Sequence, residues 1–208
     1  MPIDLSSERG FLFRITHIAN LPWLLKNGLH CANATITDPN FVAIGSPSLI
    51  ASRAHRQVLI SPHGTLSDYV PFYFTPKSPM LLNIKTGYNN ITGRPNQDIV
   101  ILVAKVETLR REEVTLLVTD RHAAIATAHF TANPADLASL IDWSILRNHD
   151  FARDPAYPDK RERYQAEALA HRCVPSRALA GIACVNDHVK PAIADSIRDA
   201  GLRPSGGR

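Results

Sequence analysis

Residues 99–106 (IVILVAKV) carry the strongest strand signal in the chain, so the fold is expected to contain a β-sheet. Short segments rich in β-branched and aliphatic residues are typical of strands. A second strand is predicted at residues 114–119 and a third near 123–130. The chain therefore has several candidate strands in its middle third.

Residues 11–18 (FLFRITHI) add another strand near the start, because their side chains alternate between two faces. One face would carry Phe11, Phe13, Ile15 and His17, and the other Leu12, Arg14, Thr16 and Ile18. A short helix is predicted to follow directly. Asn20 would cap it, Pro22 would lie in its first turn, and Gly28 would end it after Asn27.

The segment between this helix and the central strands is rich in loop signals. Residues 30–50 are predicted to be loop, and residues 49–60 to have a helical first half and a strand-like end. Residues 69–81 (YVPFYFTPKSPML) contain three prolines. Because proline cannot donate to a β-ladder, this segment is predicted as an edge strand or a loop and not as a central strand. A polar loop is expected at residues 85–98.

The last third combines helices, a charged loop and strands. Asn133 and Pro134 are predicted to start a helix whose buried stripe is Leu137, Leu140, Ile141 and Ile145. Residues 147–160 are expected to form a charged surface loop. Residues 161–171 look helical by propensity, but a strand is favoured there. A strand is expected to end the segment 176–185, and Val189, Ile193 and Ile197 mark a last helix closed by Gly201.

The composition fits one globular domain over residues 1–208, with residues 200–208 expected to be a frayed tail. Apolar residues make up 45% of the chain and charged residues 20%. The net charge of +4 favours a polyanionic partner. Cys31, Cys173 and Cys184 have no CxxC spacing, which argues against disulfides and zinc ribbons. We find neither a signal-peptide pattern nor a transmembrane run, so a cytoplasmic protein without membrane contact is expected.

Several common catalytic patterns are absent from the sequence. It has no P-loop, no GxGxxG after a strand, no HExxH and no GxSxG. The histidines are scattered without metal-ligand spacing, so a metal site is not expected. What remains are polar residues in apolar surroundings, namely His17, Arg53, Arg56 and Glu167. From the residues alone, each has an ordinary alternative: a hydrogen-bonded strand end, a solvated helix face or an exposed helix position.

Four segments together resemble a known family. They are FRITHIANLPWLLKNGL (13–29), LSDYVPFYFTPKSPML (66–81), VTDRHAAIATAHF (118–130) and RYQAEALAH (163–171). In this order they resemble the DarT family of DNA ADP-ribosyltransferase toxins. The resemblance implies an α+β fold of the PARP and ADP-ribosyltransferase type, with a split, mainly antiparallel sheet, peripheral helices and an NAD+ cleft between the halves. It implies transfer of ADP-ribose from NAD+ to a base, thymidine being favoured, in single-stranded DNA. The family's partner is an antitoxin with a macrodomain.

The resemblance also implies roles for individual residues. Glu167 matches the catalytic glutamate, and Arg53 and Arg56 are rivals for a catalytic arginine, with Arg53 preferred. His17 is expected to contact NAD+, and Asn27, Gly28, Tyr73 and His122 are further candidates for its site. The loop at about 147–162 takes the place of the substrate-recognition loop. The basic residues around it are candidates for binding DNA: Arg147, Arg153, Lys160, Arg161 and Arg163. A solvated charged segment is the alternative. Lys77 departs from the arginine expected there, which removes bidentate phosphate binding at that position.

Other functions remain open at this point. The nearest is an NAD+-dependent RNA 2′-phosphotransferase of the same broad fold. A transferase that modifies proteins is a second. A nucleic-acid-binding module without catalysis belongs to a different class and would bind DNA in a salt-dependent way without releasing nicotinamide.

Overall fold

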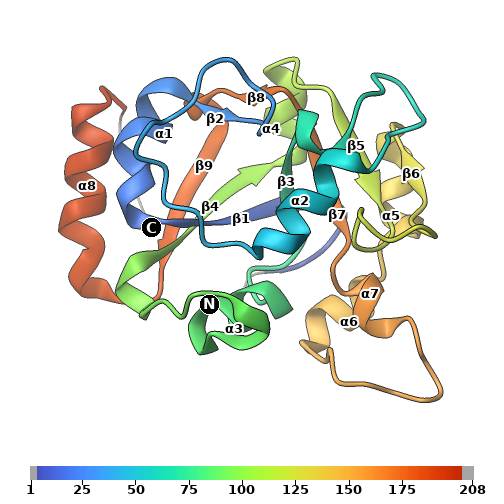
Figure 1. The fold of residues 1–208 in the computed structure, drawn as a ribbon. Coiled ribbons are helices and arrows are strands. Elements are labelled where there is room, and N and C mark those ends of the chain that lie inside the picture. Colours follow the sequence, from blue (N-terminus) through green and yellow to red (C-terminus); the bar gives the residue numbers. More distant parts are fainter. Residues whose placement is uncertain (1–3, 203–208) are drawn as a thin grey trace.

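The computed structural model describes residues 4–202 and contains a seven-stranded sheet as its main element (Figure 1). The strand order is β6-β5-β7-β3-β1-β4-β9, and all pairings in it are antiparallel. The strands are β1 (Phe11–His17), β3 (Tyr69–Tyr73), β4 (Ile99–Lys105), β5 (Leu116–Thr119), β6 (Phe130–Thr131), β7 (Glu167–His171) and β9 (Leu179–Cys184). β2 (Leu29–His30) and β8 (Cys173–Val174) form a second, two-stranded sheet.

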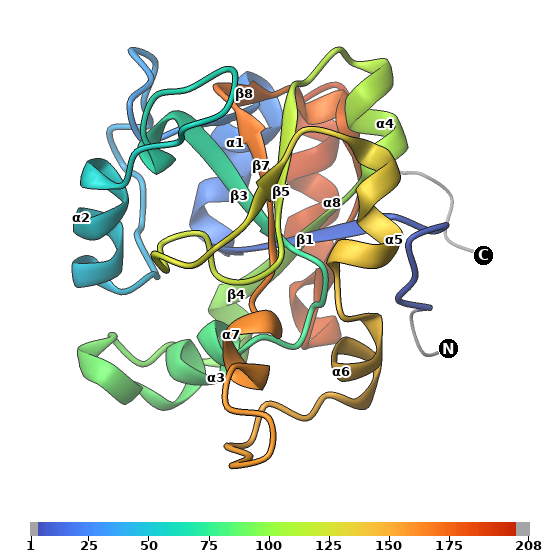
Figure 2. The same cartoon turned by 90° about the vertical axis from the view of Figure 1, so that its right-hand side faces the viewer.

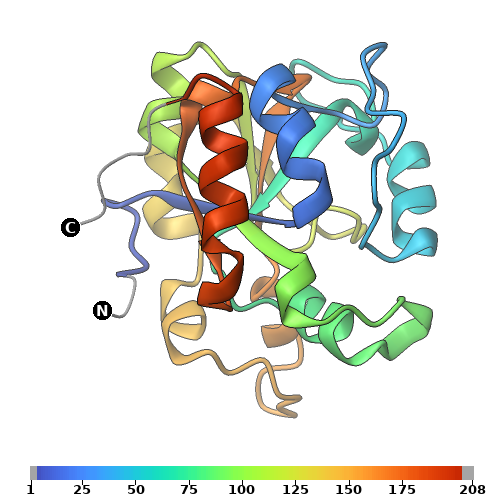
Figure 3. The same cartoon turned by 90° about the vertical axis from the view of Figure 1, so that its left-hand side faces the viewer.

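Helices surround the main sheet. They are α1 (Leu21–Asn27), α2 (Pro47–His55), α3 (Pro79–Thr86), α4 (Val106–Arg111), α5 (Leu137–Leu140), α6 (Trp143–Asn148), α7 (Lys160–Arg163) and α8 (Lys190–Asp199). α1 and α8 pack side by side (Figure 3). α2 lies on the side of the sheet opposite α4 and α5 (Figure 2). α6, α7 and the loop between them lie together at one end of the molecule (Figures 1 and 2).

The sheet is split between β1 and β3. These strands share the single register pair Phe13↔Tyr73, whereas β1 pairs with β4 over seven positions, Phe11↔Lys105 to His17↔Ile99. β3 pairs with β7 along its whole length. The two halves, β6-β5-β7-β3 and β1-β4-β9, therefore separate at the middle of the sheet, which matches the expected split architecture.

The prediction that residues 69–81 avoid the centre of the sheet is wrong, because β3 lies between β7 and β1. Pro71 is tolerated there because the β1–β3 pairing has already ended beside it. The carbonyl of Pro71 accepts a hydrogen bond from the Arg14 side chain at 2.9 Å. Since the N–H and C=O of one strand residue point the same way, the N–H that proline lacks would have faced the same open seam.

Most of the other predicted elements are confirmed, but several need correction. α3 begins at Pro79, inside the segment predicted as an edge strand or loop, and the strand-like end of residues 49–60 holds only the isolated bridge Gln57↔Thr65. The third strand near 123–130 is wrong, because this segment is a loop that reaches the sheet only at β6. Asn20 does not cap α1 with its side chain, which instead bonds Thr16 and both backbone polar groups of Val42. Asn133 caps the helical segment after it as expected. The predicted single helix with a stripe from Leu137 to Ile145 is wrong, because Ile141 has an extended backbone that separates α5 from α6. Residues 203–208 of the predicted frayed tail lie outside the described residues.

The core lies between the sheet and the helices packed on it. Its largest fully buried side chains come from β1, β3, β4 and α1 and from neighbouring segments: Tyr69, Tyr164, Phe13, Phe72, Phe74, Leu12, Leu21, Leu29, Leu66, Ile84, Ile99 and Leu102. Cys31, Cys173 and Cys184 are free thiols, as predicted. In the described part of the chain, no helix is both long and apolar enough to cross a membrane.

Candidate active site

Glu167 is the buried carboxylate around which the site is built. It is the first residue of β7, lies opposite Tyr73 in β3, and its side chain is 1% exposed. Its backbone N–H donates to the Thr119 hydroxyl at 3.2 Å, which fixes the start of the strand. A carboxylate buried to this extent needs charged or hydrogen-bonding partners, because desolvation penalises its ionised form.

Two segments distant in sequence supply these partners. Arg53, in the last turn of α2, places its Nη1 2.9 Å from Glu167 Oε2 and 3.4 Å from Oε1. The backbone N–H of Ala123, in the loop between β5 and β6, donates to Oε1 at 3.2 Å. The carboxylate is therefore held from both sides, by a helix and by a loop.

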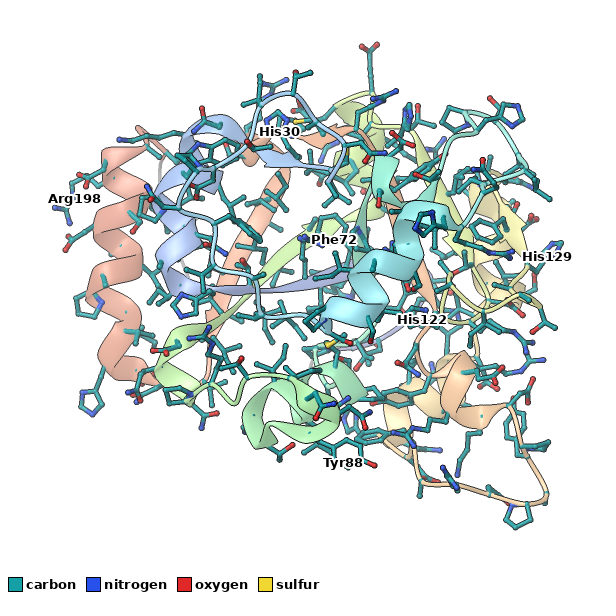
Figure 4. All side chains as sticks on the ribbon, viewed as in Figure 1. His30, Phe72, Tyr88, His122, His129 and Arg198 are labelled. Atoms are coloured by element: carbon teal, nitrogen blue, oxygen red, sulfur yellow. The ribbon has the colours of Figure 1, made fainter. Side chains whose placement is uncertain are left out.

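His122 lies next to the same carboxylate. Its Nδ1 is 3.5 Å from Glu167 Oε1 and accepts a hydrogen bond from the Ala124 N–H at 3.2 Å. Because Nδ1 accepts, the hydrogen-bond network assigns the proton of the neutral ring to Nε2. Figure 4 shows His122 close to the lower end of α2, and the ring lines the same cavity as Arg53.

Two cavities meet above the seam of the sheet. The first, of about 180 Å³, is lined by Tyr73, His122 and Glu167, and we call it the carboxylate cavity. The second, of about 350 Å³, is lined by Trp23, His30 and Tyr69, and we call it the aromatic cavity. The residues shared by both walls are Arg14, Phe41, Ile50, Arg53 and Pro71. Two guanidinium groups therefore stand where the cavities join.

The carboxylate cavity carries more positive than negative charge. Arg14 and Arg53 face a single carboxylate, that of Glu167. Burial, together with the positive charge of Arg53, lowers the pKa of Arg14 to about 10. Burial and the nearby Glu167 carboxylate raise the pKa of the Tyr73 phenol, so it stays a hydrogen-bond donor at neutral pH. Such a cavity favours an anionic or phosphorylated ligand.

Comparison with known proteins agrees with this geometry. The sequence profile described as "ssDNA thymidine ADP-ribosyltransferase, DarT" matches residues 13–206. The chain belongs to the DarT family. It is 45% identical to a DNA ADP-ribosyl transferase of Escherichia coli O127:H6 over 187 residues, covering 90% of this chain and 85% of the relative.

Solved structures and a fusion protein extend the comparison. The Thermus sp. 2.9 DarT in complex with ADP-ribosylated ssDNA superposes with a TM-score of 0.85 at 30% identity, covering 95% of this chain and 92% of that one. A Thermosipho africanus protein is named a DNA ADP-ribosyl transferase–DNA ADP-ribosyl glycohydrolase fusion. It is 26% identical over 183 residues, which cover 85% of this chain and 42% of the fusion.

The structure brings together some of the residues that the DarT resemblance singles out and separates others. Arg53, Tyr73, His122 and Glu167 line one cavity. Arg56 contacts a loop next to this cavity and does not line it. The three remaining candidates, His17, Asn27 and Gly28, also lie outside the linings of both cavities.

The positions of these outlying candidates have structural reasons. His17 accepts a hydrogen bond from the Ala19 N–H, and its Nε2 lies 3.7 Å from Asp98 Oδ2. The Asn27 side chain donates to the Trp23 carbonyl within α1. Gly28 has a φ of 88°, and a Cβ there would lie 2.8 Å from the Val174 carbonyl oxygen. Glycine is needed at this position for the helix end and for the close approach of β8.

The basic residues proposed for DNA binding have unequal surroundings. Lys160 is 6% exposed, and its ammonium lies 2.8 Å from Asp150 and 3.7 Å from Asp154. It is therefore engaged inside the loop rather than presented to a ligand. Arg163 is paired with Asp159, and Arg147 donates to the Leu5 carbonyl. Within residues 4–202, the side chains of Arg153 and Arg161 have neither a hydrogen bond nor an ion pair.

Two groups of the candidate site were not predicted from the sequence. Arg14 stands in the alternating strand on the face shared with Leu12 and Thr16, and a charge on such a face was the available signal. The Ala123 N–H is a backbone donor, and its role depends on tertiary structure alone. Among the described residues, no group of three or more His, Cys, Asp or Glu side chains is placed to hold a metal ion.

Proposed function

We propose that this protein transfers ADP-ribose from NAD+ to a thymidine base in single-stranded DNA. The observation that carries the proposal is the buried Glu167 carboxylate, paired with Arg53 in an open, cationic cavity at the seam of a split sheet. Membership of the DarT family and the likeness to a DarT complex with ADP-ribosylated ssDNA support this substrate. The Thermus sp. 2.9 DarT complex with NAD+, which superposes with a TM-score of 0.81 at 30% identity, supports NAD+ as the donor.

The proposed reaction breaks the bond between the nicotinamide nitrogen and the ribose anomeric carbon. The electron pair leaves with nicotinamide, which becomes neutral, and positive charge develops on the ribose. The Glu167 carboxylate stabilises this charge, as carboxylates do in glycoside hydrolysis. A base nitrogen then bonds the anomeric carbon, and its proton passes to Glu167. Arg53 and the Ala123 N–H hold the carboxylate in position, and the proposed steps need no metal ion.

The other contacts follow from the charges and cavities. We assign the diphosphate of NAD+ to Arg14 and Arg53, which line both cavities, because one guanidinium can donate two parallel hydrogen bonds to phosphate oxygens. Tyr73 and His122 would line the part of the carboxylate cavity where the bond to nicotinamide breaks. His17, outside both cavity linings, remains a proposed contact of NAD+. Of the basic residues near the 147–162 loop, Arg153 and Arg161 are the best placed to meet DNA phosphates.

The wider biological setting is also proposed. We place the activity in the cytoplasm, where NAD+ and DNA occur together, and we treat residues 1–208 as one catalytic domain. The partner would be an antitoxin with a macrodomain that removes ADP-ribose. The Thermosipho africanus fusion supports this pairing, because it joins a transferase to a glycohydrolase in one chain.

The test is to incubate the protein with NAD+ and a panel of short single-stranded DNAs and to weigh the products by mass spectrometry. A mass gain of one ADP-ribose is expected only on oligonucleotides that contain thymidine. Glu167→Gln should reduce this product about 100- to 1,000-fold, since it removes the charge that stabilises the transition state. Glu112→Gln is the matched control, because Glu112 forms an ion pair with Arg177 away from the cavities.

Each alternative function gives a different result when 2′-phosphorylated RNA is added to the panel and when released nicotinamide, labelled protein and bound DNA are also measured. A protein-modifying transferase would release nicotinamide and label protein while the DNA stays unmodified. An RNA 2′-phosphotransferase would act on 2′-phosphorylated RNA. A binding module would retain DNA without consuming NAD+. Any of these outcomes would contradict the proposal.

A further inference from the structure

The two arginines at the end of α2 contact different parts of the site. No residue of α2 is fully buried, and its C-terminal end makes polar contacts with the body of the protein. Arg53 reaches the Glu167 carboxylate. Arg56, at the C-cap, reaches the loop between β5 and β6 instead.

Arg56 bonds the tip of that loop. Its Nη2 donates to the carbonyl oxygens of Ile125 and Ala126, at 3.3 Å and 3.2 Å. The base of the loop is closed separately, because the Asp120 carboxylate accepts a hydrogen bond from the His129 N–H at 2.9 Å. Arg56 is therefore the side chain that fixes the tip against α2.

The tip and the Glu167 contact belong to one turn. The Ile125 N–H donates to the His122 carbonyl at 3.0 Å, and the Ala124 N–H donates to His122 Nδ1 at 3.2 Å. Ala123 lies inside this turn, and its N–H is the donor to Glu167 Oε1. The Ile125 carbonyl that Arg56 binds is therefore two residues from the Ala123 amide, within the same hydrogen-bonded turn.

We infer that Arg56 is a positioning residue that holds the β5–β6 loop so that the Ala123 amide and His122 stay aligned with the Glu167 carboxylate. The inference deepens the proposed function and rests on it where activity is measured. It gives the two arginines separate tasks, Arg53 on the carboxylate itself and Arg56 on the loop behind it. Misplacement of a reacting group by about 1 Å can cost about 100-fold in rate, so a contact two residues from the Ala123 amide is expected to have a large effect.

The test compares Arg56→Met with Arg56→Lys in the full chain. Methionine keeps much of the apolar stem but removes every donor, whereas lysine keeps a cation that can bond carbonyl oxygens. Arg198→Met is the control, because Arg198 is 73% exposed on α8, far from His122 (Figure 4). We expect kcat of Arg56→Met to fall about 10- to 100-fold, with little change in KM for NAD+ and in the melting temperature. Arg56→Lys should recover part of the loss.

A second measurement does not depend on activity. The amide proton of Ala123 should give a downfield NMR signal in the wild-type protein, and Glu167→Gln should shift it. Arg56→Met is expected to shift the same signal in the absence of substrate, and Arg198→Met is not. An unchanged Ala123 signal with wild-type kcat would overturn the inference. So would a loss of kcat that lysine does not restore and that follows a lowered melting temperature, since Arg56 would then serve stability alone.

The two failures can be told apart. If the wild-type protein modifies no oligonucleotide, the proposed function fails, while the Ala123 signal still decides the role of Arg56. If the wild-type protein is active and Arg56→Met behaves like Arg198→Met in both measurements, only the inference on Arg56 fails.

Discussion

Arg53 and Glu167 are 114 positions apart in the sequence, yet Arg53 Nη1 lies 2.9 Å from Glu167 Oε2. Their side chains are 12% and 1% exposed. The pair joins α2, which has no buried residue, to a central strand of the sheet. The same contact therefore holds a peripheral helix in place and orients the carboxylate proposed to be catalytic.

Breaking this ion pair from one side should destabilise the fold. Arg53→Met leaves the Glu167 carboxylate buried with the Ala123 N–H as its closest remaining donor. We expect the free energy of unfolding to fall by about 3 kcal/mol, the cost of an uncompensated buried charge. The double variant Arg53→Met/Glu167→Gln should recover most of that loss, because it removes both charges. Urea unfolding at pH 7 of the two single variants and the double variant measures the interaction energy between Arg53 and Glu167. If the effects of the two substitutions simply add, the prediction is wrong.

Arg14 should contribute to ligand binding rather than to the positioning of the Glu167 carboxylate. The one hydrogen bond of its side chain within the described chain is to the neutral Pro71 carbonyl, so further N–H donors are available to a ligand. If the proposed diphosphate contact exists, Arg14→Gln removes a charged hydrogen bond worth about 1.5 kcal/mol and weakens ADP-ribose binding about tenfold. Calorimetry with ADP-ribose measures this. Arg110→Gln, at an exposed position of α4, is the control, and equal affinities for the two variants would refute the contact.

Much of the fold could be predicted because local patterns and tertiary structure agree. The alternation at β1, the aliphatic run of β4 and the Gly28 helix end all appear where the sequence places them. β3 could not be predicted as central, because its proline is acceptable only beside a seam that the sequence does not show. The segment before β6 was wrongly expected to be a strand, because its apolar residues belong to a loop. This loop contacts α2 through Arg56 and β7 through Glu167.

The candidate site was predictable at the residue level only through resemblance to the DarT family. Glu167 stands in an alanine-rich stretch that by propensity alone favours a helix, and the structure places it at the first position of β7. Arg53 and Arg56 look equivalent in sequence, being three positions apart. Only the end of α2 and the position of the β5–β6 loop decide which of them reaches the carboxylate.

The loop between α6 and α7 should respond differently to loss of Lys160 and of Arg153. Lys160 joins Asp150 and Asp154, and its hydrogen bond to Asp150 raises its pKa. Lys160→Met should therefore loosen the loop and speed its cleavage by a nonspecific protease. Arg153→Gln should leave cleavage unchanged but reduce the salt dependence of single-stranded DNA binding, by about 0.7 in the log–log slope for one lost phosphate contact. Equal cleavage of the wild-type protein and Lys160→Met would show that the ion pairs do not order the loop.

Asp68 should make the stability of the protein depend on acid pH. Its carboxylate accepts hydrogen bonds from the Thr65 N–H at 2.8 Å and from the Asn33 side chain at 3.1 Å. The Thr65 N–H is the main cause that lowers the pKa of Asp68 below its ordinary value of 3.8. A lowered pKa in the folded state contributes stability above the unfolded value, and this contribution is lost as the pH falls through the folded value. Below about pH 3.8, the contribution of Asp68 should therefore disappear progressively.

Comparing the wild-type protein with Asp68→Asn isolates the contribution of Asp68, because all other carboxylates are the same in the two proteins. At pH 7 the variant should be less stable by about 1 kcal/mol, the usual loss for a capping carboxylate. The difference should stay constant down to about pH 5 and shrink towards zero as both proteins are titrated below pH 4, where the wild-type side chain is itself neutral. Asp187→Asn is the control, because Asp187 is 83% exposed. Urea unfolding from pH 7 to pH 2.5 measures both variants, and a difference that grows in acid would show that the hydrogen bonds of Asp68 favour its protonated form.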